Sequence, residues 1–175
     1  RHGLATRNAV VNVMTRSVTD RRWWRNDPDC LMVRDTDTKL TEDEVRLLAT
    51  VMAMTDGMLV LSDRLTRLGA ARRALIARAR ELAGGRVEVP DLFERAIPEV
   101  LVTRHDGRVD VGALNSGDRP RRVTVDLPRR GVQCDDGTYH EFWTGEAVPV
   151  RGGIADFGTL PPHAARVLRV DGPTP

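Results

Sequence analysis

An unbroken apolar run, Met58 to Leu61, lies between two segments of helical periodicity, and this order constrains the fold more than any other feature. Such a run is typical of a strand that is covered on both faces, as in a parallel sheet. Parallel strands need a crossover connection, which is usually a helix. The first part of the chain is therefore predicted to consist of βα units.

Three segments of this first part are predicted to be helical. The first runs from Leu4 to about Val18 and has its apolar residues on one face: Leu4, Val11, Met14 and Val18. Thr41 to Glu44 has the spacing of a capping box, which predicts a buried helix from Val45 to about Thr55. A third helix is expected between Asp63 and Ala83. Its predicted apolar stripe consists of Leu65, Leu68, Leu75, Ile76, Ala79 and Leu82.

After Pro98 the pattern changes to short alternating runs that are separated by turn residues. The runs are Val100–Thr103, Val109–Leu114, Val123–Leu127, Tyr139–Trp143 and Ala165–Val170. Alternation of apolar and polar residues indicates antiparallel strands with one buried face, as in a β-sandwich. Pro90 and Pro98 bracket a linker, so we expect a boundary between two domains at residues 86–98.

Charge and cysteine content exclude several classes of protein. The 27 basic and 25 acidic residues of this 175-residue chain nearly balance, which argues against a nucleic-acid partner. The longest apolar stretch, Leu47 to Leu61, is interrupted by Asp56 and is too short to span a membrane. Cys30 and Cys134 form neither a zinc signature nor a disulfide framework, which favours a cytoplasmic over a secreted protein. Because the chain begins with Arg1, we interpret it as a piece of a longer protein.

The most unusual stretch of the sequence is Trp23 to Cys30. Asp27 and Asp29 are two residues apart and would share a face in an extended chain. Carboxylates at the end of a parallel strand lie where barrel enzymes place their pockets, and tryptophans beside carboxylates are typical of sugar sites. The alternative is that Asn26 and the two aspartates form a turn and cap a helix, while the two tryptophans pack. Two carboxylates supply too few oxygens for a hard cation, so no metal site is expected.

Three segments together resemble the α-galactosidase (melibiase) group, glycoside hydrolase families 27 and 36. They are Asn26-Asp27-Pro28-Asp29, the helix opened by Leu40 to Glu44, and Leu61 to Leu65. Two later segments, Phe142–Glu146 and Leu160–Leu168, resemble the appended β-domain of that group. The resemblance implies that residues 1–98 are the last βα units of an incomplete (β/α)8 barrel. Residues 99–175 would then be its C-terminal antiparallel β-sandwich domain.

By resemblance, the parent is a retaining glycosidase that cleaves terminal α-linked galactose without a cofactor. Its nucleophile and acid/base lie on earlier strands, so no catalytic residue is assigned here and the chain alone is expected to be inactive. Asp29 and Cys30 would line the galactose pocket, Asp27 would support the loop, and Trp24 is a nearer pocket neighbour than Trp23. Many relatives have Met or Val at the position of Cys30, which leaves the sugar preference open. The expected partner is an oligosaccharide or glycoside, and a homo-oligomeric parent is compatible with the resemblance.

Two alternatives stay open at the level of the sequence. One is a non-catalytic carbohydrate-binding or scaffolding module, and the other is a related α-glycosidase with a different sugar specificity. His163 follows two prolines and has no nucleophile beside it in the sequence, so we expect a capping or packing role for it. Trp143 is expected to be a core residue.

Overall fold

The structure, a computed structural model, describes residues 3–171. Its first part contains α1 (Gly3–Arg16), a 3-10 turn η1 (Ser17–Thr19), β1 (Cys30–Leu31), α2 (Glu42–Met54), β2 (Val60–Leu61), η2 (Leu65–Arg67) and α3 (Ala70–Glu81). β1 and β2 pair in parallel, with Cys30 opposite Val60 and Leu31 opposite Leu61. The predicted arrangement of parallel strands joined by a helix is therefore confirmed for this pair.

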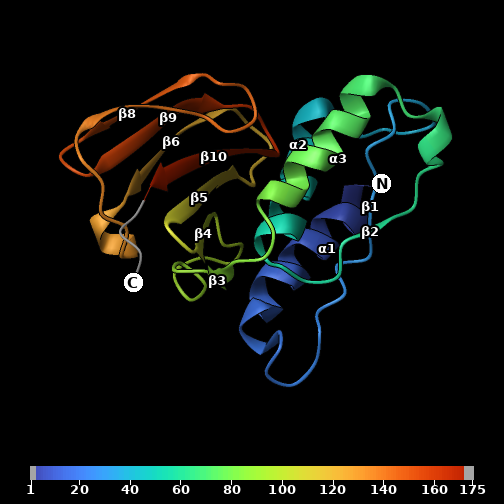
Figure 1. Ribbon diagram of the computed structural model, residues 1–175, viewed down its shortest axis with the longest axis horizontal. Coiled ribbons are helices and arrows are strands. Elements are labelled where there is room, and N and C mark those ends of the chain that lie inside the picture. The colour runs from blue at the N-terminus through green and yellow to red at the C-terminus, as the bar shows by residue number, and fades with distance from the viewer. Residues whose placement is uncertain (1–2, 172–175) are drawn as a thin grey trace.

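The second part is all β apart from one 3-10 turn. Its elements are β3 (Arg86–Glu88), β4 (Val100–His105), β5 (Arg108–Asn115), β6 (Arg121–Asp126), η3 (Pro128–Arg130), β7 (Gly137–His140), β8 (Ala147–Arg151), β9 (Ile154–Leu160) and β10 (Ala164–Asp171). They form two antiparallel sheets of four strands, in the orders β10-β5-β4-β3 and β6-β9-β8-β7. Figure 1 shows these strands on one side of the molecule and α1–α3 with β1 and β2 on the other.

The two sheets share a hydrophobic core of small and branched side chains. Val102 and Val111 from the first sheet and Val125 and Val150 from the second are almost completely buried in it. Alternation accounts for this: in β6, Val123 and Val125 point inward while Thr124 and Asp126 are exposed. The antiparallel β region predicted after Pro98 is confirmed. Within residues 3–171, no helix has the length and apolar character needed to cross a bilayer.

Helix α2 begins at the predicted capping box. The Glu44 amide donates to Thr41 Oγ1 at 3.2 Å, and the Thr41 amide donates to Glu44 Oε2 at 2.8 Å. The helix is then buried along almost its whole length, and its buried residues are Val45, Leu48, Ala49, Thr50, Val51, Met52, Ala53 and Met54. A helix that is apolar all round needs neighbours on every side.

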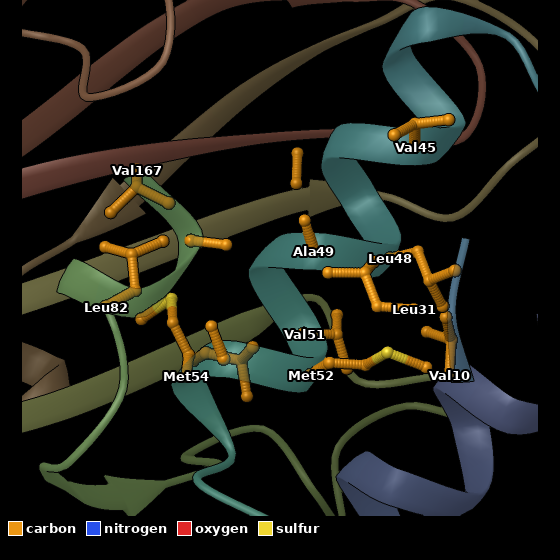
Figure 2. Packing of buried hydrophobic residues seen from close by; sticks show 14 of the residues in the cluster. Val10, Leu31, Val45, Leu48, Ala49, Val51, Met52, Met54, Leu82 and Val167 are labelled. Carbon is orange, nitrogen blue, oxygen red and sulfur yellow. The ribbon is translucent and has the colours of Figure 1, made fainter. Parts of the chain in front are cut away.

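These neighbours come from both parts of the chain. Figure 2 shows Val10 of α1 and Leu31 of β1 on one side of α2, and Leu82 at the end of α3 with Val167 of β10 on the opposite side. On the sheet, Gly112 allows close approach, because a Cβ there would stand 3.0 Å from the Met54 sulfur. One continuous core therefore joins the helices to the β10-β5-β4-β3 sheet.

Several boundaries differ from those predicted. α1 ends at Arg16, and its buried positions are Val10, Val13 and Met14, whereas Val18 is 51% exposed. The side chain of Leu4, the first residue of the predicted stripe, lies outside the described residues. Leu65 is also 51% exposed, because it belongs to η2 and not to α3. Both misplaced residues sit in 3-10 turns, where helical spacing does not hold.

Three strands were not predicted from the sequence. β3 lies in the predicted linker and pairs with β4, and β8 and β9 form a hairpin around Gly152-Gly153. The predicted strand from Tyr139 to Trp143 ends at His140, where a turn begins: the Gly145 amide donates to the Glu141 carbonyl, and the Glu141 amide donates to the Glu146 carbonyl. Trp143 is nevertheless a core residue, as predicted. Its indole Nε1 donates to Thr50 Oγ1 of α2 at 2.9 Å.

His163 joins the N-terminus of α2 to the sheets. Its Nδ1 lies 3.1 Å from Glu44 Oε1, and its Nε2 lies 2.8 Å from Asp118 Oδ1. A neutral imidazole carries one N–H, so only the protonated ring donates to both carboxylates. Burial opposes this charge, but the hydrogen bonds with Asp118 and Glu44 outweigh it and raise the pKa of His163 above its usual 6.5. Its role is structural, in line with the expectation from the sequence.

The contact with His163 shifts the pKa of Glu44 in the opposite direction, to a lower value. Burial alone would raise its pKa, but the Thr41 backbone hydrogen bond and the bond with His163 outweigh burial and lower it below 4.5. A raised histidine pKa stabilises the fold fully below the unfolded value and loses this contribution as pH rises through the folded pKa. A lowered glutamate pKa contributes above its unfolded value and loses its contribution as pH falls through the folded pKa.

We therefore expect a pH-dependent loss of stability in His163→Asn. Asparagine tolerates the left-handed backbone at this position, where φ is 52°. The difference in melting temperature between the parent chain and the variant should be largest between about pH 4.5 and 6.5 and should shrink at higher pH. Circular-dichroism melts across this range measure it. A difference that does not change with pH would contradict the bridge.

The second stability prediction concerns the buried pair of Thr50 and Trp143. Thr50→Val keeps the side-chain shape but leaves the indole N–H without an acceptor, at a cost of about 1–3 kcal/mol. Urea unfolding measures the change. Thr124→Val on the exposed face of β6 is the matched control and should change the free energy of unfolding by less than about 0.5 kcal/mol. Equal effects of the two changes would show that the hydrogen bond is not important.

Candidate functional site

The Asn26-Asp27-Pro28-Asp29 segment precedes β1 and bulges away from β2. The Met58 amide donates to the Asn26 carbonyl at 2.9 Å, and the next pairing along the chain is Cys30 with Val60. Residues 27–29 therefore lie opposite the single residue Leu59. The prediction that this motif ends a parallel strand is wrong, because the strand hydrogen bonding resumes only after the motif.

The bulge has a specific local cause. Asp29 has a φ of 70°, and its amide donates to Asp27 Oδ1 at 2.9 Å. Pro28 between them is buried and supplies no amide hydrogen. An aspartate that bonds the amide two residues on is a typical turn-former, and Asp is one of the residues that tolerate positive φ. The chain is thus not extended here, and the strand-parity argument for a shared face of Asp27 and Asp29 does not apply.

Asn26 fixes the segment to its surroundings through all of its polar groups. Its Nδ2 donates to the Arg16 carbonyl and its Oδ1 accepts from Trp24 Nε1, both at 2.8 Å. Its amide donates to Asp20 Oδ1 at 2.5 Å, and its carbonyl accepts from Met58. Asn26 is only 6% exposed, so these bonds satisfy groups that water does not reach. The side chain of Asn26 joins the end of α1 to the indole of Trp24, and its backbone carbonyl joins both to the segment before β2.

The turn before β2 leaves no room for a side chain. A Cβ on Gly57 would lie 2.8 Å from the Asn26 carbonyl oxygen and 3.5 Å from Pro28 Cδ. The preceding residue, Asp56, accepts from the Gly84 amide at 2.8 Å and forms an ion pair with Arg21. The position of the motif therefore depends on a glycine in a different segment of the chain.

A cleft of about 340 Å³ opens between α1 and this segment. α1 supplies one wall with Ala9, Asn12, Val13 and Arg16, and the motif supplies the other with Trp24, Asn26, Asp27, Pro28 and Asp29. Asp27 and Asp29 are exposed, and Trp24 is 52% exposed with its N–H already bound to Asn26. The cleft thus presents an indole surface, carboxylate acceptors and the donors of α1, a combination suited to a polyhydroxyl ligand.

The structure brings three of the four predicted site residues to this cleft. Asp27, Asp29 and Trp24 line it, whereas Cys30 does not. Cys30 starts β1 beside Asp29, whose hydrogen bond and negative charge, with partial burial, raise the pKa of the thiol above its usual range. The thiol is therefore neutral and is a poor nucleophile. The sugar-contacting roles of these four residues remain predictions.

At the opposite end of the parallel strands, Asp63 is a further buried polar residue. Its Oδ2 accepts from the Val33 and Arg34 amides at 2.6 and 3.1 Å. Asp63 follows β2, so it ties the ends of the two strands together. The sequence places Asp63 in the Leu61–Leu65 segment of the resemblance but does not predict these contacts, because nothing in the local pattern identifies its distant partners.

The sequence interpretation also missed the α1 wall. Asn12 and Arg16 are four residues apart and share a helix face with Ala9 and Val13. The spacing of these four residues is visible in the sequence. The apolar residues of α1, however, do not show which of its other faces lies against the motif. Arg21 and Arg25 in the following loop pair with Asp56 and Asp20, whereas Arg16 has no ion-pair partner within residues 3–171.

No protein-family model matches the chain. Several solved structures, however, are similar to it in fold. A variant of a GH27 β-L-arabinopyranosidase from Geobacillus stearothermophilus, in complex with arabinose, is 14% identical with a TM-score of 0.73, covering 96% of this chain and 42% of that chain. α-Galactosidase I from Mortierella vinacea is 16% identical with a TM-score of 0.62, and the match covers 94% of this chain and 44% of that chain. The α-galactosidase from Saccharomyces cerevisiae is 13% identical with a TM-score of 0.65, and the match covers 94% of this chain and 51% of that chain.

This likeness establishes the fold, which is that of the C-terminal part of GH27 glycosidases. The resemblance to the α-galactosidase group that the sequence motifs predicted is thereby confirmed. The chain spans between 42% and 51% of the length of these three structures. Each neighbour is a glycosidase, and the chain is glycoside hydrolase-like in fold.

The geometry around Gly57 generates a prediction about the site. Gly57→Ala places a methyl group against the Asn26 carbonyl, so the motif must move and the 2.9 Å bond from Met58 must lengthen. We expect Trp24 fluorescence to shift to longer wavelength and amide exchange at Met58 to accelerate. Gly69→Ala is the matched control, because a Cβ there meets nothing within 4 Å. Unchanged exchange at Met58 in Gly57→Ala would show that the contact does not hold the motif.

Proposed function

We propose that this chain is the C-terminal part of a retaining glycoside hydrolase that cleaves terminal α-linked galactose. The observation that supports it best is the cleft formed by Trp24, Asp27 and Asp29 on a fold shared with galactosidases. In this proposal the chain contributes one side of the sugar pocket. The hydrolytic residues belong to strands of the parent that precede it.

The proposed parent has a (β/α)8 barrel, of which residues 1–98 form the last units, followed by a β-sandwich formed by residues 99–175. The two-stranded parallel sheet supports this proposal, because β1 and β2 alone are a small part of any stable parallel sheet. The exposed apolar residues near these strands also support it, since further strands would cover them. They are Val18, Trp23, Met58 and Val60.

The different roles proposed for Asp27 and Asp29 follow from their contacts. Asp27 accepts the Asp29 amide and thereby holds the turn, whereas the Asp29 side chain is exposed in the cleft and has only the neighbouring Cys30 thiol as a side-chain hydrogen-bond partner within residues 3–171. A retaining mechanism needs a nucleophile and an acid/base about 5–5.5 Å apart. Because Asp27 is committed to the turn, the pair is not assigned these roles. Asp29 instead accepts hydrogen bonds from sugar hydroxyls.

The experiment is a galactose titration of the chain, followed by Trp fluorescence and saturation-transfer NMR. Asp29→Asn keeps a residue suited to φ of 70° but removes the charge. A lost charge-assisted hydrogen bond of about 1.5–3 kcal/mol should lower affinity on the order of 10- to 150-fold, with little change in melting temperature. Asp27→Ala removes the turn acceptor and should lower the melting temperature instead.

The same chain should not hydrolyse a nitrophenyl α-galactoside, because the proposed acid/base pair lies elsewhere in the parent. Turnover that Asp29→Asn abolishes would contradict this assignment and would place the chemistry in the motif. Galactose binding confined to residues 99–175 would favour a carbohydrate-binding module. Tighter binding of another monosaccharide than of galactose would favour an α-glycosidase of different specificity.

A further inference from the structure

A second cavity, of about 280 Å³, lies where the helices meet the β-sheets. α1, the start of α2, the segment before β4 and the turns before β6 and β10 contribute to its walls. Its apolar lining residues are Val10, Val11, Leu40, Leu47 and Ile97, and its charged ones are Arg7, Glu44, Asp118 and His163. None of these residues lines the cleft at the Asn26–Asp29 motif, so the two sites are separate.

The apolar part of this cavity can still bury surface. Val10 is buried, whereas the other four apolar lining residues are only half-buried. An apolar pocket on which a few polar groups converge is typical of a small-molecule site. Such pockets usually measure about 300–1,000 Å³, so a cavity of this size suits a small ligand. A hydrocarbon group inside it would remove apolar surface of both ligand and protein from water, which is favourable.

The polar end of the cavity has more acceptors than donors. His163 Nδ1 lies 3.1 Å from Glu44 Oε1, and its Nε2 lies 2.8 Å from Asp118 Oδ1. The protonated ring donates to both carboxylates, but a neutral ring has one N–H and can donate to only one. When His163 loses its proton, one carboxylate therefore lacks its donor. Arg7 of α1 is the other charged lining residue, and it is exposed, so water and salt screen its repulsion of a cation.

We propose that this cavity binds a small apolar amine, whose hydrocarbon part packs against the apolar lining and whose ammonium group donates to Glu44 and Asp118. An ammonium group carries three donors and no acceptor, which matches two carboxylates, whereas a carboxylate ligand would be repelled by them. The proposal does not rest on the proposed function, because it uses neither the motif nor hydrolysis.

The amine and the proton on His163 compete for the same two carboxylates. The affinity for an amine should therefore rise as pH rises through the pKa of His163, which lies above its usual 6.5. By linkage, a bound amine should lower that pKa by the corresponding amount. An uncharged ligand in the same cavity should show neither effect.

The test titrates the full chain with hexylamine, hexan-1-ol and hexanoate and follows the methyl NMR signals of Val11 and Leu47. The measurements are made at about pH 5.5 and about pH 8.5, where an alkylamine is still charged. Hexylamine should bind most tightly and hexanoate least. Its affinity should be about 1.5- to 5-fold higher at the higher pH, as expected for a partly exposed ion pair. The imidazole signals of His163 measure the accompanying decrease in its pKa.

Two variants test the two ends of the cavity. Val11→Phe fills the apolar part and should abolish binding of all three probes. Asn8→Phe is its matched control, because Asn8 is exposed on α1 and does not line the cavity. Asp118→Asn keeps the shape of the rim but removes a charge, so it should lower hexylamine affinity about 1.5- to 5-fold and leave hexan-1-ol unchanged. Asp106→Asn, in another exposed turn, should change neither affinity.

Melting curves verify that each variant folds. The side chain of Asp118 is 80% exposed, so Asp118→Asn tests the polar end even if Val11→Phe does not fold. Hexylamine binding that a folded Val11→Phe retains would overturn the cavity as the site. Equal affinity for hexylamine and hexan-1-ol at the higher pH, or tighter binding of hexanoate, would overturn the selection of an amine. A chain that binds none of the probes would overturn the whole inference, and galactose binding at the motif would be unaffected.

Discussion

The burial of α2 is the constraint on which the rest of the structure depends. This helix has apolar residues on nearly all sides, so it must be enclosed by α1, β1, α3 and the β10-β5-β4-β3 sheet at once. The bond between Trp143 and Thr50 adds a polar contact with a defined direction inside that enclosure. Because one helix contributes to the core on both sides, the helical part and the sheets cannot pack independently.

The candidate site inherits its geometry from this packing. α1 and β1 lie against α2 through Val10 and Leu31 (Figure 2), and the cleft opens between the end of α1 and the segment that leads into β1. Asn26 then fixes the position of the segment that leads into β1, because its side chain bonds the last residue of α1. The two aspartates of the motif can be exposed in the cleft because their turn is supported from behind by buried groups.

Ionic contacts at the junction of helices and sheets reinforce the same arrangement. In the first turn of α2, Asp43 pairs with Arg166 of β10, and Glu44 pairs with His163, the residue before β10. Acidic residues at a helix N-terminus are favoured by the helix dipole, and here the same residues also bond across the interface. The orientation of α2 relative to the sheets is thereby fixed at its N-terminus by charge and along its length by apolar contacts.

The sequence by itself determined the parallel pair, the capped buried helix and the antiparallel region, because each is encoded by a local pattern. Thr41 to Glu44 and the alternation in Val123 to Leu127 need no distant partner to be recognised. Only the tertiary structure decided that the motif is a bulge, that Gly57 limits its position and that Asn12 and Arg16 face it. These features depend on contacts between segments that are far apart in the chain, and no local periodicity records which segments meet.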